Sequence, residues 1–194
     1  NDIYSCDSLI ITAGTFLNGL IHIGTRKFRA GRMGEKPAIG LTESLINKEF
    51  SVGRLKTGTP PRSLKKSIDW EKTQLAPGDE TPTPFSINST QGFNPVNEPC
   101  HIVDTNLNVH KYLKENLQKS AMFSGQIGGV GPRYCPSIED KIIRFASRDS
   151  HQLFLEPEWT NSDQIYVNGF STSMPESVQK HSLRQIPALE HVEF

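Results

Sequence analysis

Residues 7–14 (DSLIITAG) have the pattern of a core strand that ends at a glycine turn. In a doubly wound α/β sheet, ligands lie beyond the carboxyl ends of such strands, where small residues let a cofactor approach. The turn at residues 12–15 (TAGT) is therefore a candidate for ligand contact, and the alternative is an ordinary turn of a common kind. The apolar run starts close to the first residue, with no signal peptide or Arg-rich transit pattern before it, so we expect an internal fragment of a longer protein.

The rest of the chain predicts short strands and helices around loop-rich segments. Short apolar runs predict strands over 20–24, 50–55, 101–103 and 152–155. Apolar residues at helical spacing predict helices that begin near Pro37 and that cover 108–120, 136–146 and 175–186. Pro, Thr, Ser, Asn and Asp dominate from residue 63 to residue 99, so this segment is predicted to be rich in loops.

Composition is that of an ordinary globular chain of 194 residues, long enough for one sizeable core or two small ones. Lys plus Arg and Asp plus Glu both number 21, so any RNA contact must come from a local basic patch. The three cysteines have neither disulfide nor zinc spacing, which indicates a reducing compartment and predicts no metal site. No apolar run approaches the roughly 20 residues that span a bilayer.

Residues 128–141 (GGVGPRYCPSIEDK) contain the most informative candidate for chemistry. If Pro136 is the first helical residue, Cys135 is the N-cap and its thiol faces the positive end of a helix. Arg133 lies two residues away, and this environment favours the thiolate. The pattern predicts a nucleophile at Cys135, and the alternative is a buried, inert cysteine.

A compact basic cluster surrounds residues 57–61 (TGTPP). Arg54, Lys56 and Arg62, together with the threonine hydroxyls, could bind a phosphate group, and the alternative is a solvated surface turn. Glu156 and Glu158 flank a proline, which favours an acidic turn over a catalytic acid–base pair. No complete dinucleotide or P-loop motif occurs in the chain.

Five stretches together resemble the MnmG/GidA family over nearly the whole chain. They are TAGTFLNGLIHIG (12–24), GRLKTGTPPR (53–62), GVGPRYCPSIEDK (129–141), LEPE (155–158) and NGFSTSMP (168–175), in the order and approximate spacing of that family. The chain departs from the family at residues 103–106, which read VDTN where many members read THTN. The two longest stretches make the resemblance highly specific.

The resemblance implies an α/β fold, with part of a FAD-binding doubly wound domain over residues 1–62 and an inserted α/β domain over 63–194. It also implies a FAD-dependent enzyme that installs a carboxymethylaminomethyl-type group at C5 of the wobble uridine (position 34) of tRNA, with NADH and a methylene-folate donor. The expected partners are tRNA, a GTPase of the MnmE type and a second copy of the full-length protein. The family's GxGxxG segment and its C-terminal helical region do not match here, so the fragment is expected to be inactive alone.

The resemblance carries roles over to particular residues. Cys135 matches a family cysteine implicated in catalysis, and a thiolate that adds to C6 of uracil would make C5 nucleophilic. Four further matches would help to hold the base or the reduced flavin: Arg133, Tyr134, Glu139 and Lys141. Three match the flavin-side turn: Thr12, Gly14 and Thr15.

Two alternative functions remain. A relative of the folate- and FAD-dependent tRNA uridine C5-methyltransferase would use the same cofactors, but that family lacks most of the region that is long here, 63–150. A non-catalytic RNA- or partner-binding module would explain the basic turn and the missing flavin motif. The Asn- and Ser-rich connecting segments favour a mitochondrial member of the family over one from the bacterial cytoplasm.

Overall fold

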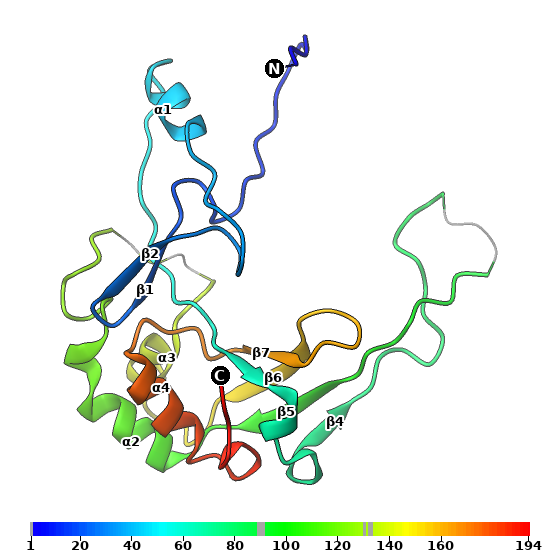
Figure 1. Cartoon of the computed structure of the whole chain (residues 1–194), viewed down its shortest axis with the longest axis vertical. Coiled ribbons are helices and arrows are strands. Elements are labelled where there is room, and N and C mark those ends of the chain that lie inside the picture. The colour runs from blue at the N-terminus through cyan, green and yellow to red at the C-terminus, as the bar shows by residue number, and fades with distance from the viewer. Residues whose placement is uncertain (1, 89–91, 130, 132–133) are drawn as a thin grey trace. The chain divides into compact units, whose positions relative to one another are not determined.

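The computed structural model of the chain describes residues 2–88, 92–129, 131 and 134–194. The chain divides into two compact units. The first unit consists of residues 1–21 and 26–53, and the second consists of residues 22–25 and 54–194. Helices and strands both contribute (Figure 1), so the predicted α/β class is confirmed.

The first unit contains a pair of short strands and a short helix. Strands β1 (Leu20–Ile23) and β2 (Arg26–Arg29) pair as a two-stranded sheet, and β1 continues into the second unit. Helix α1 (Leu41–Ile46) begins later than the position predicted from Pro37. Gly40 has a φ of 100°, and its N–H donates to Glu43 Oε2 at 2.9 Å, so this capping contact sets where the helix begins.

The predicted strand over residues 7–14 does not form. Leu9 is 75% exposed and Ile10 is 84% exposed, and no strand of the described chain pairs with this segment. A strand needs a hydrogen-bonding neighbour, and apolar sequence alone does not supply one. The predicted strand over 50–55 is also absent, since only Leu55 forms an isolated bridge there.

A five-stranded antiparallel sheet forms the framework of the second unit (Figure 1). In spatial order its strands are β3 (Arg62–Leu64), β7 (Gln164–Asn168), β6 (Gln152–Pro157), β5 (Cys100–Asp104) and β4 (Gln74–Ala76). The predicted strands near 101–103 and 152–155 correspond to β5 and β6. Strands β3, β4 and β7 come from segments where no strand is predicted, and two single-turn helices, η1 (Lys65–Ser67) and η2 (Trp70–Lys72), lie between β3 and β4.

Helices and the sheet share one hydrophobic core. The helices are α2 (Leu107–Glu115), η3 (Leu117–Lys119), α3 (Ile138–Arg144), α4 (Glu176–Leu183) and η4 (Pro187–Leu189). Alternate residues of β6 and β7 supply four fully buried side chains: Leu153, Leu155, Ile165 and Val167. The helices supply the matching apolar face, with Leu113 from α2, Ile142 from α3 and Leu183 from α4. None of the described helices has the length and apolar content that a membrane crossing needs.

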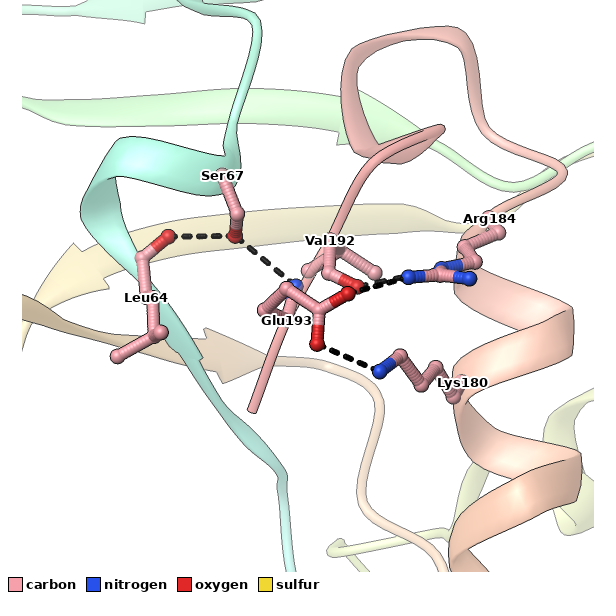
Figure 2. Close-up of polar contacts among 6 residues, drawn as sticks. All are labelled: Leu64, Ser67, Lys180, Arg184, Val192 and Glu193. Carbon is pink, nitrogen blue, oxygen red and sulfur yellow. Dashed lines mark hydrogen bonds and ion pairs between the residues drawn. The ribbon is translucent and has the colours of Figure 1, made fainter.

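The last residues of the chain are tied to β3 and α4 (Figure 2). Leu64 N–H donates to the Glu193 carbonyl at 2.8 Å, and Glu193 N–H donates to Ser67 Oγ at 3.0 Å. The Glu193 carboxylate accepts from Lys180 at 2.6 Å and from Arg184 at 2.5 Å. These hydrogen bonds hold the segment after η4 against β3, η1 and α4.

Candidate functional site

Helix α3 begins two residues later than predicted, which changes the position of Cys135. Ser137, not Cys135, is the N-cap: Asp140 N–H donates to Ser137 Oγ at 3.1 Å, and Ser137 N–H donates to Asp140 Oδ2 at 3.2 Å. Serine is a favoured N-cap and cysteine is not, so the capping box prevails over the helix start predicted from Pro136. Cys135 lies outside the helix and is exposed.

The thiol of Cys135 contacts Thr57, a residue of the basic turn. Thr57 Oγ1 and Cys135 Sγ are 3.6 Å apart, and either atom can donate. Thr57 is half-buried, whereas Cys135 is open to solvent. Two of the stretches that carry the family resemblance therefore meet at a reachable sulfur atom, although 78 residues separate them in the sequence.

Both stretches are anchored on residues 171–173, which belong to a third such stretch. Thr59 N–H donates to the Thr172 carbonyl at 2.9 Å, and the reverse bond from Thr172 N–H measures 3.3 Å. A Cβ on Gly58 would lie 2.3 Å from the Thr172 nitrogen, so only glycine fits there. On the other side, Ile138 N–H donates to the Ser171 carbonyl at 2.7 Å.

Glu139 joins these segments through its carboxylate. The side chain is fully buried, and Oε1 accepts from Ser120 Oγ at 3.0 Å, Thr172 Oγ1 at 2.9 Å and Ser173 N–H at 3.1 Å. Oε2 has no hydrogen-bond partner within the described part of the chain. The sequence predicts that Glu139 helps to hold the base or flavin, but the structure encloses its carboxylate in protein, where it holds the backbone beside Cys135.

Lys141 lies two residues after Glu139 on α3 and is half-buried. Its Nζ donates to the Gly169 carbonyl at 2.8 Å. Burial lowers the pKa of Lys141, and the charge interaction with Cys135 offsets part of that shift. The ammonium group of Lys141 is therefore held by the turn after β7.

The structure divides the predicted basic cluster. Arg62 forms a two-pronged ion pair with Glu158 at 3.0 and 3.1 Å, and its guanidinium carbon lies 4.7 Å from the centre of the Tyr166 ring. Because this guanidinium is already paired, we do not retain Arg62 as a phosphate-binding residue. Glu158 supplies its partner, and the acidic turn predicted around Pro157 does not form, because Glu156 and Pro157 belong to strand β6. Arg54 is exposed. Lys56 Nζ donates a hydrogen bond to the Met122 carbonyl at 3.5 Å.

The other predicted site residues lie in varied surroundings. Arg133 falls outside the described residues. Tyr134 is 85% exposed, beside the thiol in the sequence. In the first unit, Thr12 and Thr15 are exposed, and Gly14 has a φ of 60°, so a turn does form where the flavin-side contact is predicted. No group of three or more His, Cys, Asp or Glu residues within the described ranges could hold a metal ion.

Sequence reasoning misses three residues of this site, Ser120, Thr172 and Ser173, and it considers the Thr57 hydroxyl only as a possible phosphate-binding group. Their hydroxyl groups line the contacts between Cys135, Glu139 and the 171–173 segment. Serine and threonine are common in turns, so the presence of these residue types does not indicate a functional site. Thr57 and residues 171–173 do lie within the stretches that resemble the family, and this was the one indication in the sequence that they belong to the site.

A family model described as "Glucose inhibited division protein A" matches residues 1–194. The chain belongs to this family. The resemblance to GidA proteins inferred from the five stretches is therefore confirmed.

Individual GidA relatives agree with this assignment. The tRNA uridine 5-carboxymethylaminomethyl modification enzyme MnmG of Cytophaga hutchinsonii is 50% identical over 189 residues, which are 97% of this chain and 30% of the relative. The enzyme of the same name from Bdellovibrio bacteriovorus is 54% identical over 183 residues, 94% of this chain and 28% of the relative. The form I crystal structure of Aquifex aeolicus GidA matches with a TM-score of 0.78 at 43% identity, over 94% of this chain and 31% of that chain. The chain thus spans about a third or less of each of these proteins.

Proposed function

We propose that this chain is part of a FAD-dependent enzyme that installs a carboxymethylaminomethyl-type group at C5 of the wobble uridine (position 34) of tRNA. We further propose that Cys135 supplies the nucleophile. The observation that carries this proposal is an exposed thiol at the meeting point of three stretches that resemble GidA proteins. The names of the bacterial relatives support the substrate class.

The chemistry requires a temporary bond from sulfur to uracil. The Cys135 thiolate adds to C6, and the electrons of the C5–C6 double bond move onto the C4 carbonyl as an enolate. C5 is then nucleophilic and bonds to the incoming one-carbon group, and an amine donor that bears a carboxymethyl group bonds to the same carbon through its nitrogen. Loss of the C5 proton and departure of the thiolate restore the double bond. The exposed Tyr134 ring beside Cys135 is suited to stack on the base.

Cofactors and partners follow from the family and are part of the same proposal. FAD, reduced by NADH, would supply the redox step, and a methylene-folate would supply the carbon. The turn at Thr12, Gly14 and Thr15 fits a flavin contact, because its glycine is in a left-handed conformation and its hydroxyl-bearing residues are exposed. We also propose a GTPase partner of the MnmE type, a homodimeric full-length protein and a mitochondrial location.

The test of this function is Cys135→Ser in the full-length protein. We expect the variant to keep its flavin absorbance but to form no modified uridine, as measured by mass spectrometry of nucleosides from tRNA. Cys6→Ser, at an exposed cysteine in the first unit, is the matched control and should keep full activity. Normal modification by Cys135→Ser would remove Cys135 from the mechanism, and a 5-methyluridine product from the parent protein would favour the methyltransferase alternative.

A further inference from the structure

Thr57 is the hydrogen-bond partner that the structure gives to the Cys135 thiol. The oxygen and sulfur atoms are 3.6 Å apart, and no other hydrogen bond to this sulfur occurs within the described ranges. The sulfur stays exposed on its remaining side. A threonine hydroxyl can accept from a neutral S–H, and it can donate to a thiolate once the proton has left.

The backbone on both sides fixes this pair. Gly58, the next residue after Thr57, packs against residues 171–172 so closely that no side chain fits. The Ile138 N–H bond to Ser171 and the carboxylate of Glu139 hold the start of α3 on the same segment. Thr57 and Cys135 therefore lie on two backbone segments that are each bonded to residues 171–173. Their contact is set by the backbone as well as by side-chain rotation.

The loop before Cys135 also follows the segment that carries Thr57. A Cβ on Gly129, whose φ is 113°, would lie 2.6 Å from the Arg54 carbonyl oxygen. A Cβ on Gly131 would lie 3.6 Å from the Lys56 carbonyl oxygen. The close approach at Gly129, together with the ordinary contact distance at Gly131, places both glycines beside residues 54–56.

We propose that Thr57 is a positioning residue for Cys135: its hydroxyl donates to the thiolate, stabilises the ionised form and holds the sulfur in place for attack. This proposal rests on the proposed function, in which Cys135 is the nucleophile. A hydrogen bond to an ionised acceptor is stronger than one to a neutral acceptor, so it shifts the equilibrium toward the thiolate. Thr57→Val removes the hydroxyl and keeps the branched shape, whereas Thr57→Ser keeps the hydroxyl.

The test is the rate at which iodoacetamide alkylates Cys135 in the full-length protein, followed by mass spectrometry of the Cys135 peptide. If the hydrogen bond shifts the thiol–thiolate equilibrium about tenfold, Thr57→Val should react about threefold more slowly at pH 7, because the loss of thiolate outweighs its gain in nucleophilicity. At pH 10, which is above the ordinary cysteine pKa of about 8.5, the same variant should react equally fast or up to about threefold faster. Thr57→Ser should match the parent at both pH values.

Thr59→Val is the matched control, because it makes the same substitution two residues along the chain and leaves the backbone bridge to Thr172 possible. It should leave both rates unchanged. An unchanged rate for Thr57→Val at pH 7, or a reduction of the same size at both pH values, would overturn the proposal, since the second result indicates altered access to the thiol. Alkylation requires no turnover, so this result is independent of whether Cys135→Ser abolishes tRNA modification.

Discussion

At the scale of single residues, the most informative side chain is one that does not reach solvent. The sequence places Glu139 among residues that match a catalytic stretch, and the structure buries it completely. One carboxylate oxygen accepts three hydrogen bonds, from Ser120, Thr172 and Ser173. An anionic oxygen is well suited to accept three donors at once.

Glu139→Gln tests this arrangement. The amide oxygen can replace the acceptor, but it is neutral, and the amide nitrogen brings donors to a position where the described residues offer Oε2 no partner. We expect the free energy of unfolding to fall by about 1–3 kcal/mol, as measured by denaturant titration. Glu156→Gln is the control, since Glu156 is less buried and its carboxylate accepts a single hydrogen bond from Asn168. Equal stability of Glu139→Gln and the parent would contradict the assignment.

At the scale of elements, the local sequence pattern predicted a helix or strand correctly where a single pattern was present. Apolar runs found β1, β5 and β6, and helical spacing found α2, α3 and α4. The start of α3 was predicted wrongly because the proline rule and the capping box compete, although Ser137 and Asp140 have the spacing of a capping box in the sequence. Residues 7–14 have a strand composition but no strand partner, and composition cannot reveal a missing partner.

The contact between Thr57 and Cys135 could not be predicted from local signals at all. It depends on Thr59 pairing with Thr172, a bridge across more than a hundred residues. Local chemistry and the family resemblance both selected the two stretches, but neither indicated that they touch. Non-local pairing of this kind is set by the whole fold.

Gly58→Ala tests the anchoring of this element. The new methyl group would need the place now filled by the backbone at Ser171 and Thr172, so one segment must move away from the other. We expect a loss of about 1–3 kcal/mol in the free energy of unfolding, and slower alkylation of Cys135. Gly53→Ala, where nothing lies within 4 Å of the added Cβ, should change neither measurement. A parent-like Gly58→Ala protein would mean that the segments are not held this closely.

At the scale of the whole molecule, two buried histidines predict how stability depends on pH. The ring centres of His110 and His151 are 5.1 Å apart. Thr105 Oγ1 lies 2.7 Å from His110 Nε2, and it accepts a hydrogen bond from the backbone N–H of His151 at 2.8 Å. Burial lowers the pKa of both rings below the ordinary value of 6.5. The charge of Lys114 adds to the lowering of the His110 pKa, and Asp149 opposes it. The charges of His110, Lys141 and Arg148 add to the lowering of the His151 pKa.

The sign of the effect follows from the lowered pKa values. Below the ordinary value the unfolded chain takes up protons that the folded chain resists, so the free energy of unfolding falls as the pH drops from about 7 toward 5. His110→Gln should reduce this slope, as measured by denaturant titration at pH 7.5, 6.5 and 5.5. His191→Gln, at an exposed histidine, is the control and should keep the parent slope. Parallel curves for the parent and His110→Gln would rule out this source of acid sensitivity.

The shared anchor at residues 171–173 has a consequence for thermal motion. The segments that carry the Thr57 hydroxyl and the Cys135 sulfur are both bonded to these residues. When the anchor shifts, it carries the two groups in the same direction by similar amounts. Their separation should therefore fluctuate less than either position does on its own, and a side chain exposed to solvent gains a stable local geometry without being buried.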